Sequence, residues 1–145
     1  MALPDFVWGA IGAAIGWPVV EFIARPFRQF FDLRRRVARC LVEYANVPAR
    51  SREDQRGDIY TSDLSPEDKV RLTEAQAAYR RLAADMRAFS KGEWAANKVV
   101  MAFGYNPNEI ASALLGVSNN LPIKGQDLHD AHQRLERLLG VRTIE

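Results

Sequence analysis

The sequence predicts an all-α protein in which a single N-terminal transmembrane helix continues into a basic amphipathic helix and then a small helical bundle. One observation behind this fold class is an apolar run, Phe6–Ala24, in which Glu21 is the only formal charge. The other is a series of later segments in which apolar residues recur every three or four positions, the spacing of one helix face. We expect four regions: an anchor (1–25), a juxtamembrane helix (26–47), a loop (48–65) and a bundle (66–145).

The run Phe6–Ala24 has the length of a membrane-spanning helix. At 1.5 Å per residue it would extend over about 28 Å, close to the ~30 Å hydrocarbon thickness of a bilayer. Glu21 lies near one end, four residues before Arg25, an order that favours an ion pair on a helix. A peripheral segment and a buried helix of a soluble bundle are the alternatives. The three glycines and Pro18 of this run disfavour the soluble helix.

Small residues share one face of the predicted anchor. A ridge of small residues lets another helix approach closely in a membrane. This face is therefore the candidate surface for packing against another membrane protein or a second copy of the chain. Its members are Gly9, Gly12, Ala13 and Gly16.

The segment 26–47 predicts a basic amphipathic helix next to the membrane. Its aromatic residues Phe27, Phe30 and Phe31 lie where an interfacial helix would dip its rings into the bilayer. Arginines follow the apolar run and none precedes it, which predicts a cytoplasmic position for everything after the anchor. The candidate contacts with anionic lipid headgroups are Arg25, Arg28, Arg34, Arg35, Arg36 and Arg39.

The remaining chain predicts a loop followed by the cytoplasmic bundle. Residues 48–65 interrupt the periodicity with proline, glycine and mixed charges, and are expected to be a mobile loop. Ser65-Pro66 and Asn106-Pro107 mark helix starts, because a capping side chain precedes a proline at the first helical position. We expect helices over 66–92, 93–103, 107–118 and 126–139.

No pattern predicts catalysis, a metal or a cofactor. His129 and His132 lie three apart, but a metal site needs further ligands and no second histidine or cysteine cluster supplies them. Cys40, the one cysteine, falls among apolar residues at helical spacing and is expected to be a small buried hydrophobe. Neither a nucleophile–base pair nor a glycine-rich phosphate loop is recognisable. We therefore expect a protein that is not an enzyme.

One stretch echoes a helix-turn-helix. Ala111 and Gly116 are five positions apart, one more than that motif requires, and one residue rotates a helix by about 100°. The residues that follow contain Pro122 and a single lysine, too few basic groups to bind DNA phosphates. Nucleic acid is therefore not an expected partner.

Together these patterns predict a membrane-anchored accessory or scaffold protein that acts by association with protein partners and anionic lipids. No small-molecule substrate is evident. Two alternatives stay open. One is a soluble all-α binding module or DNA-linked regulator, and the other is a small membrane effector that oligomerises through Gly12 and Gly16.

Overall fold

The computed structural model describes residues 14, 16–17, 20–48, 50–51 and 64–140. Within this part of the chain, five α-helices form a small all-α bundle, preceded by a π-helical turn, η1 (Val20–Ala24). The fold class is thus confirmed as an all-α bundle. The helices are α2 (Arg25–Glu43), α3 (Pro66–Gly92), α4 (Trp94–Ala102), α5 (Pro107–Asn120) and α6 (Gln126–Leu139).

None of the helices in the described ranges is long and apolar enough to cross a membrane. Most of the predicted transmembrane run, positions 6–13, 15 and 18–19, lies outside those ranges. The predicted anchor itself therefore stays a prediction.

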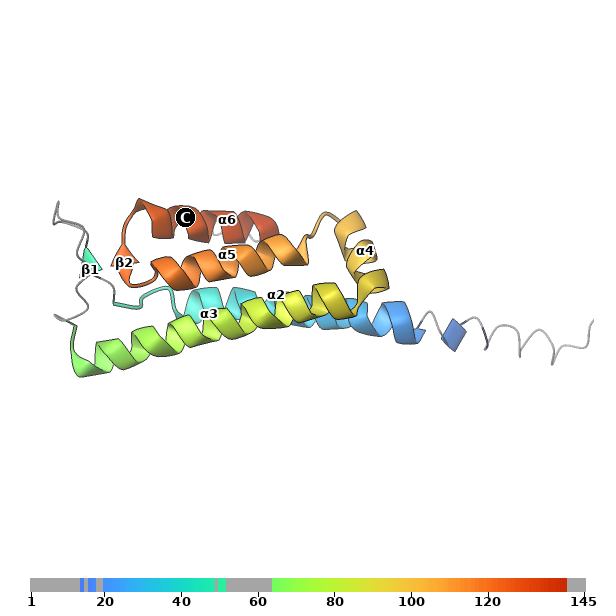
Figure 1. The fold of residues 1–145 in the computed structure, drawn as a ribbon, viewed down its shortest axis with the longest axis horizontal. Coiled ribbons are helices and arrows are strands. Elements are labelled where there is room, and N and C mark those ends of the chain that lie inside the picture. Colours follow the sequence, from blue (N-terminus) through green and yellow to red (C-terminus); the bar gives the residue numbers. More distant parts are fainter. Residues whose placement is uncertain (1–13, 15, 18–19, 49, 52–63, 141–145) are drawn as a thin grey trace, which may run out of the picture.

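Helices α2, α3, α5 and α6 run along a common axis, and α4 lies across one end of them (Figure 1). Helix α3 contacts both α2 and α5, and α5 contacts α6. At 1.5 Å per residue, α3 extends over about 40 Å and sets the length of the bundle. The start of α2 lies at the same end as α4, so η1 leaves the bundle beside α4 and contacts it.

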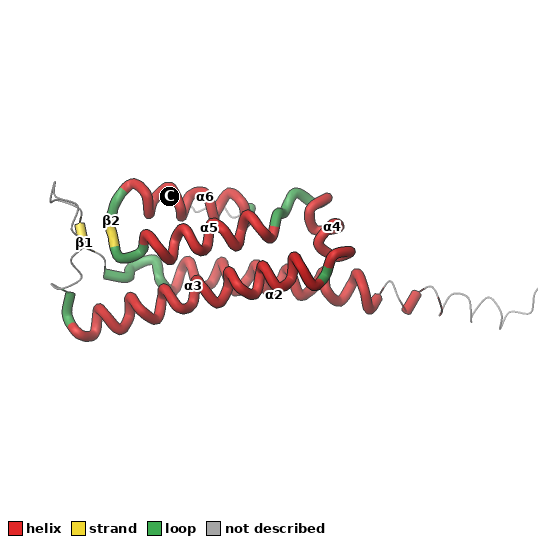
Figure 2. The backbone as a smooth tube through the Cα atoms, in the orientation of Figure 1, coloured by secondary structure: helices red, strands yellow, loops and turns green. Residues whose placement is uncertain are grey.

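A short strand pair that the sequence did not predict joins two connections. β1 (Arg50–Ser51) pairs in parallel with β2 (Ile123–Lys124), as the tube in Figure 2 shows. This pairing attaches the first part of the predicted loop to the α5–α6 connection. Residues 52–63 of that loop lie outside the described ranges, so its predicted mobility is not tested.

Helix α2 belongs to the hydrophobic core. Phe30, Leu33, Val37 and Cys40 recur at spacings of three or four residues, and each is at most 5% exposed. The core therefore extends beyond the predicted region 66–145 and includes the segment that we expected to lie along the membrane.

The aromatic rings of α2 pack inside the bundle. The ring of Phe30 is fully buried, with its centroid 5.6 Å from that of Phe89 on α3 and 5.5 Å from that of Tyr105. The prediction that Phe30 dips into a membrane is therefore wrong. Phe27 and Phe31 are partly buried against the same core.

Polar contacts join α3 to its neighbours within this core. The Gln76 side chain donates to the Ser118 carbonyl of α5 at 3.1 Å, and the Ser118 hydroxyl donates to the Gln76 carbonyl at 3.2 Å. The buried Tyr79 hydroxyl donates to the Cys40 carbonyl of α2 at 3.5 Å. These pairs satisfy polar groups that burial would otherwise penalise.

Both helix starts marked in the sequence are confirmed. The Ser65 hydroxyl accepts a hydrogen bond from the Asp68 backbone N–H at 3.1 Å. The Asn106 side-chain oxygen accepts from the N–H groups of Asn108 and Glu109, and its amide donates to the Glu109 carboxylate at 2.7 Å. Each cap satisfies donors that the first helical turn leaves without an intrahelical partner.

Replacing Phe30 with alanine is expected to lower the free energy of unfolding by about 3–5 kcal/mol, because the lost ring leaves a cavity in the core. Denaturant unfolding of the full-length chain in mild detergent, followed by circular dichroism, measures the loss. The control is Val42→Ala on the same helix, where the side chain is 80% exposed and the loss should stay below about 0.5 kcal/mol. Similar losses in the two variants would contradict this placement of α2.

Candidate functional site

The outer face of α2 carries a row of arginines. At 100° per residue, the buried residues of α2 lie on one side of the helix, and an arc of about 100° lies opposite them. All five arginines on that arc are exposed, and Asp32 and Glu43 lie on the same face. Positive charge is therefore in excess there. The arginines are Arg25, Arg28, Arg35, Arg36 and Arg39.

Three of these arginines form ion pairs. Arg25 pairs with Glu21 at 2.6 Å across the junction of η1 and α2, as their spacing predicted. Arg36 reaches Asp85 of α3 at 3.2 Å. Arg35 lies 3.7 Å from Asp32. Such exposed pairs contribute at most about 1 kcal/mol each, so they leave the arginines available to other anions.

The sixth predicted headgroup residue, Arg34, is engaged inside the bundle. Its Nε donates to the Leu139 carbonyl at 2.7 Å, and its guanidinium carbon lies 5.4 Å from the centroid of the Tyr105 ring. Helix α6 ends there at Leu139, and the capping residue Gly140 has a φ of +61°, a conformation that glycine adopts without strain. A cation at a helix C-terminus is favourable, so Arg34 joins α2 to α6. Binding a headgroup would require it to leave these contacts.

Large exposed hydrophobic side chains gather at one end of the bundle. In the described part of the chain eight such residues are exposed. Four of them lie on η1 and α4, which contact each other at this end of the bundle, and Phe103 caps α4. The Trp17 ring lies beside that of Phe22, with the two centroids 6.4 Å apart. Val42 and Val70, near the end of α2 and the start of α3, are the other two. We call the six residues the apolar end: Trp17, Val20, Phe22, Trp94, Met101 and Phe103.

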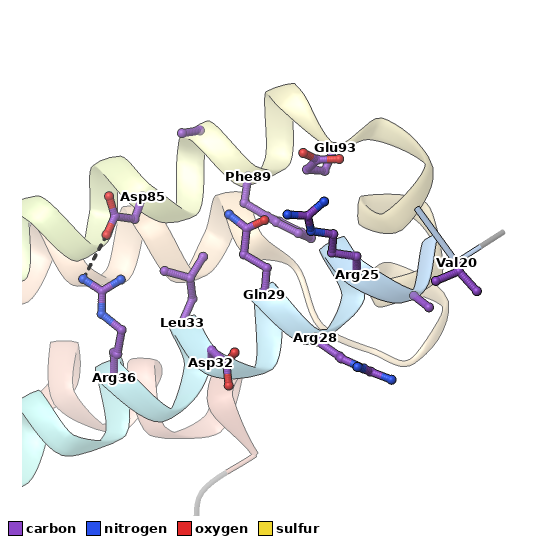
Figure 3. A pocket seen from close by; sticks show the side chains of 12 residues that line it. Val20, Arg25, Arg28, Gln29, Asp32, Leu33, Arg36, Asp85, Phe89 and Glu93 are labelled. Carbon is purple, nitrogen blue, oxygen red and sulfur yellow. Dashed lines mark ion pairs between the residues drawn. The ribbon is translucent and has the colours of Figure 1, made fainter. Parts of the chain in front are cut away.

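A shallow groove of about 710 Å³ separates the start of α2 from the last part of α3 (Figure 3). Charged side chains of both signs line it, and the dashed line in Figure 3 marks the pair of Arg36 with Asp85. Because the charges nearly balance, the groove favours neither an anion nor a cation. We interpret it as a solvent-filled gap between the polar sides of two packed helices.

The predicted helix-packing ridge is described at one position only. Gly9, Gly12 and Ala13 lie outside the described residues. Gly16 is exposed, and a Cβ atom added to it would meet no atom within 4 Å. The room that a second helix would need is therefore open at Gly16.

Both histidines contact groups of their own helix. His129 lies 2.8 Å from the side-chain amide of Gln133, and His132 lies 3.0 Å from the carbonyl of Leu128. Among the residues that the structure describes, no three His, Cys, Asp or Glu side chains are placed to hold a metal ion.

Cys40 is buried, as predicted. Burial, and to a lesser extent the nearby Glu43 carboxylate, raises the pKa of the Cys40 thiol to about 11. The thiol stays protonated near neutral pH, whereas a reactive cysteine needs a lowered pKa.

Helices α5 and α6 form an antiparallel hairpin rather than the crossed pair of a helix-turn-helix (Figures 1 and 2). Gly116, which resembles the turn glycine of that motif, lies inside α5. A Cβ atom there would come within 4.0 Å of Ala131 on α6. That distance is an ordinary van der Waals contact, so Gly116 faces α6 at a position where alanine would also fit.

Two parts of this surface were missed from the sequence. The inward role of Arg34 had no sequence signal, because its carbonyl acceptor lies 105 residues away. The exposed side of α4 did have a sequence signal, because its apolar residues and lysine recur at helical spacing. Trp94, Lys98 and Met101 stand at i, i+4 and i+7, opposite the buried Ala96 and Val100.

Comparison with known proteins adds no assignment. No protein-family model, curated protein or solved structure matches the chain. The function must therefore be inferred from the geometry above.

Replacing Arg34 with glutamine is expected to lower the free energy of unfolding by about 1–2 kcal/mol, since a charged hydrogen bond at a helix end is lost. Urea unfolding of the full-length chain measures the change in midpoint at constant slope. The matched control, Arg35→Gln, removes the same charge from a side chain that is 81% exposed, and should change stability by less than about 0.5 kcal/mol. Equal effects at the two positions would refute the structural role of Arg34.

Proposed function

We propose that this protein is a membrane-anchored helical accessory or scaffold protein, held in the membrane by the run Phe6–Ala24 with its bundle on the cytoplasmic side. The observation that carries the proposal is the continuity of η1 with α2. Residues 20–24 lead into α2 without a break, and the Glu21–Arg25 pair spans the junction. The apolar run is thus joined directly to a helix that forms part of the core.

This connection supports a structural role. A flexible linker would let the bundle move freely relative to the anchor, whereas a helix fixed by core packing restricts both its position and its rotation. An anchor joined in this way holds the bundle in one orientation. That property suits a subunit whose task is to present a surface to a partner.

The chemistry of the described surface also supports association over catalysis. Arginines cover the outer face of α2, the one cysteine is buried, and both histidines contact groups of their own helix. An exposed basic face attracts anionic lipids or an acidic protein surface, with a strength that falls as salt rises. Lateral packing through Gly9, Gly12, Ala13 and Gly16 would supply a second contact, inside the membrane.

Extraction of membranes with alkaline carbonate tests the anchor. The full-length chain should stay in the membrane fraction and dissolve only in detergent. Ile11→Lys together with Ile15→Lys should release it, because each charge near the bilayer centre costs about 2.5–3.5 kcal/mol. The matched control adds the same two charges at exposed positions of the bundle, Val42→Lys and Val70→Lys, and should stay in the membrane fraction.

Release of the unaltered chain by carbonate would overturn the proposal. That result would favour the alternative of a soluble binding module, in which residues 6–24 cover an apolar surface of the protein itself or of a partner.

A further inference from the structure

The outer side of α4 is a stripe of apolar residues with one lysine. Trp94 is 69% exposed and Met101 is 48% exposed, and Lys98 lies between them on the same face. The Lys98 ammonium is 5.7 Å from the centroid of the Trp94 ring. Tryptophan and lysine suit the boundary between lipid headgroups and acyl chains, because the ring stays at the boundary and the ammonium extends to the phosphates.

The apolar side chain after α4 packs against α2 on one side. Phe103 is 67% exposed, yet the centroid of its ring is 5.7 Å from that of Phe27 on α2. Gly104 follows with a φ of +87°, which turns the chain so that Tyr105 packs against Phe30. Phe103 thus contacts Phe27 on one side, while most of its surface stays exposed at the end of the bundle.

The apolar end is continuous with the predicted anchor. Turn η1 contacts α4, and its exposed residues Val20 and Phe22 belong to the same end of the bundle. The chain before Val20 is the apolar run itself. Large apolar side chains gathered at one place on a surface mark an interaction site, so this end is a candidate contact surface. The surface nearest to a membrane anchor is the membrane.

We propose that the apolar end seats the bundle upright on the bilayer, with Trp94, Met101 and Phe103 in the headgroup–acyl boundary. The inference rests on the proposed anchor and adds a second membrane contact to it. Because α4 lies across the end of the bundle, α4 lies along the membrane surface while α2 and α3 extend away from it (Figure 1).

An upright bundle divides the arginines of α2. Arg25 and Arg28 lie in the first turn, next to the membrane and within reach of headgroups. Arg39 lies fourteen residues beyond Arg25, about 21 Å further along the helix and well beyond the ~8 Å Debye length at physiological salt. Lipid contact therefore involves the first two arginines. Arg35, Arg36 and Arg39 face the cytoplasm or a protein partner.

Tryptophan fluorescence of the full-length chain in vesicles tests the contact. The vesicles contain phosphatidylcholine and phosphatidylglycerol with bromine on the acyl chains near the headgroups, which quenches nearby indole rings. The double variant W8F/W17F leaves Trp94 as the only reporter. The variant W17F/W94F leaves Trp8, in the predicted anchor. The matched control, W8F/W17F/W94F/V70W, carries its one tryptophan at the other end of the bundle, about 33 Å away along α3.

We expect Trp94 to lose most of its emission to the brominated lipid, to shift to shorter wavelength and to resist quenching by aqueous iodide. The V70W control should respond to iodide and not to the lipid. Lipid quenching of Trp8 without quenching of Trp94 would overturn this inference and leave the anchor intact. No quenching of either Trp8 or Trp94 would overturn the anchor and the inference together, whereas quenching of Trp94 alone would overturn only the anchor. Protection of Trp94 from iodide without lipid quenching would assign the apolar end to a second copy or another protein, and would also refute the proposal.

Discussion

The burial of one face of α2 determines where the other features of this protein lie. Phe30, Leu33, Val37 and Cys40 are enclosed by the core, so the opposite face of the same helix, with most of its arginines, must point outward. A shift of one residue would rotate α2 by about 100° and bring arginines into the core, which the cost of an unpaired buried charge forbids. The same packing directs η1 out of the bundle beside α4. The positions of the apolar end and of the arginine face of α2 therefore both follow from the burial of the opposite face of α2.

The arginines that follow the apolar run have different environments despite their common sequence pattern. Arg34 lies at the edge of the buried face, where it binds the Leu139 carbonyl and stacks on Tyr105. The other five lie on the outer face, and their distance from the apolar end increases along the helix. A basic amphipathic helix can thus pack into the core of a bundle with one face and form an interaction surface with the other. Its composition alone does not separate the two roles.

Local patterns predicted the helices of this protein well and their packing less well. The caps at Ser65 and Asn106 and the apolar spacing identify helices whose observed bounds agree closely with the expected ones, because these signals act within one or two turns. The incorporation of α2 into the core, and the exposure of Trp94, depend on contacts between distant segments. The β1–β2 pairing is of the same kind, since it joins two residues to a connection more than seventy positions away. Sequence periodicity shows that a helix has an apolar face but does not show whether protein or lipid covers it.

In the proposed arrangement, a continuous helix and an apolar end hold the bundle upright on the membrane. The thickness of the protein layer on a supported bilayer, measured by neutron reflectometry with the full-length chain, tests this most directly. An upright bundle gives a layer about 40 Å thick, the length of α3 at 1.5 Å per residue. A layer about 20 Å thick, the width of two packed helices, would show that the bundle lies on its side and would refute the upright arrangement.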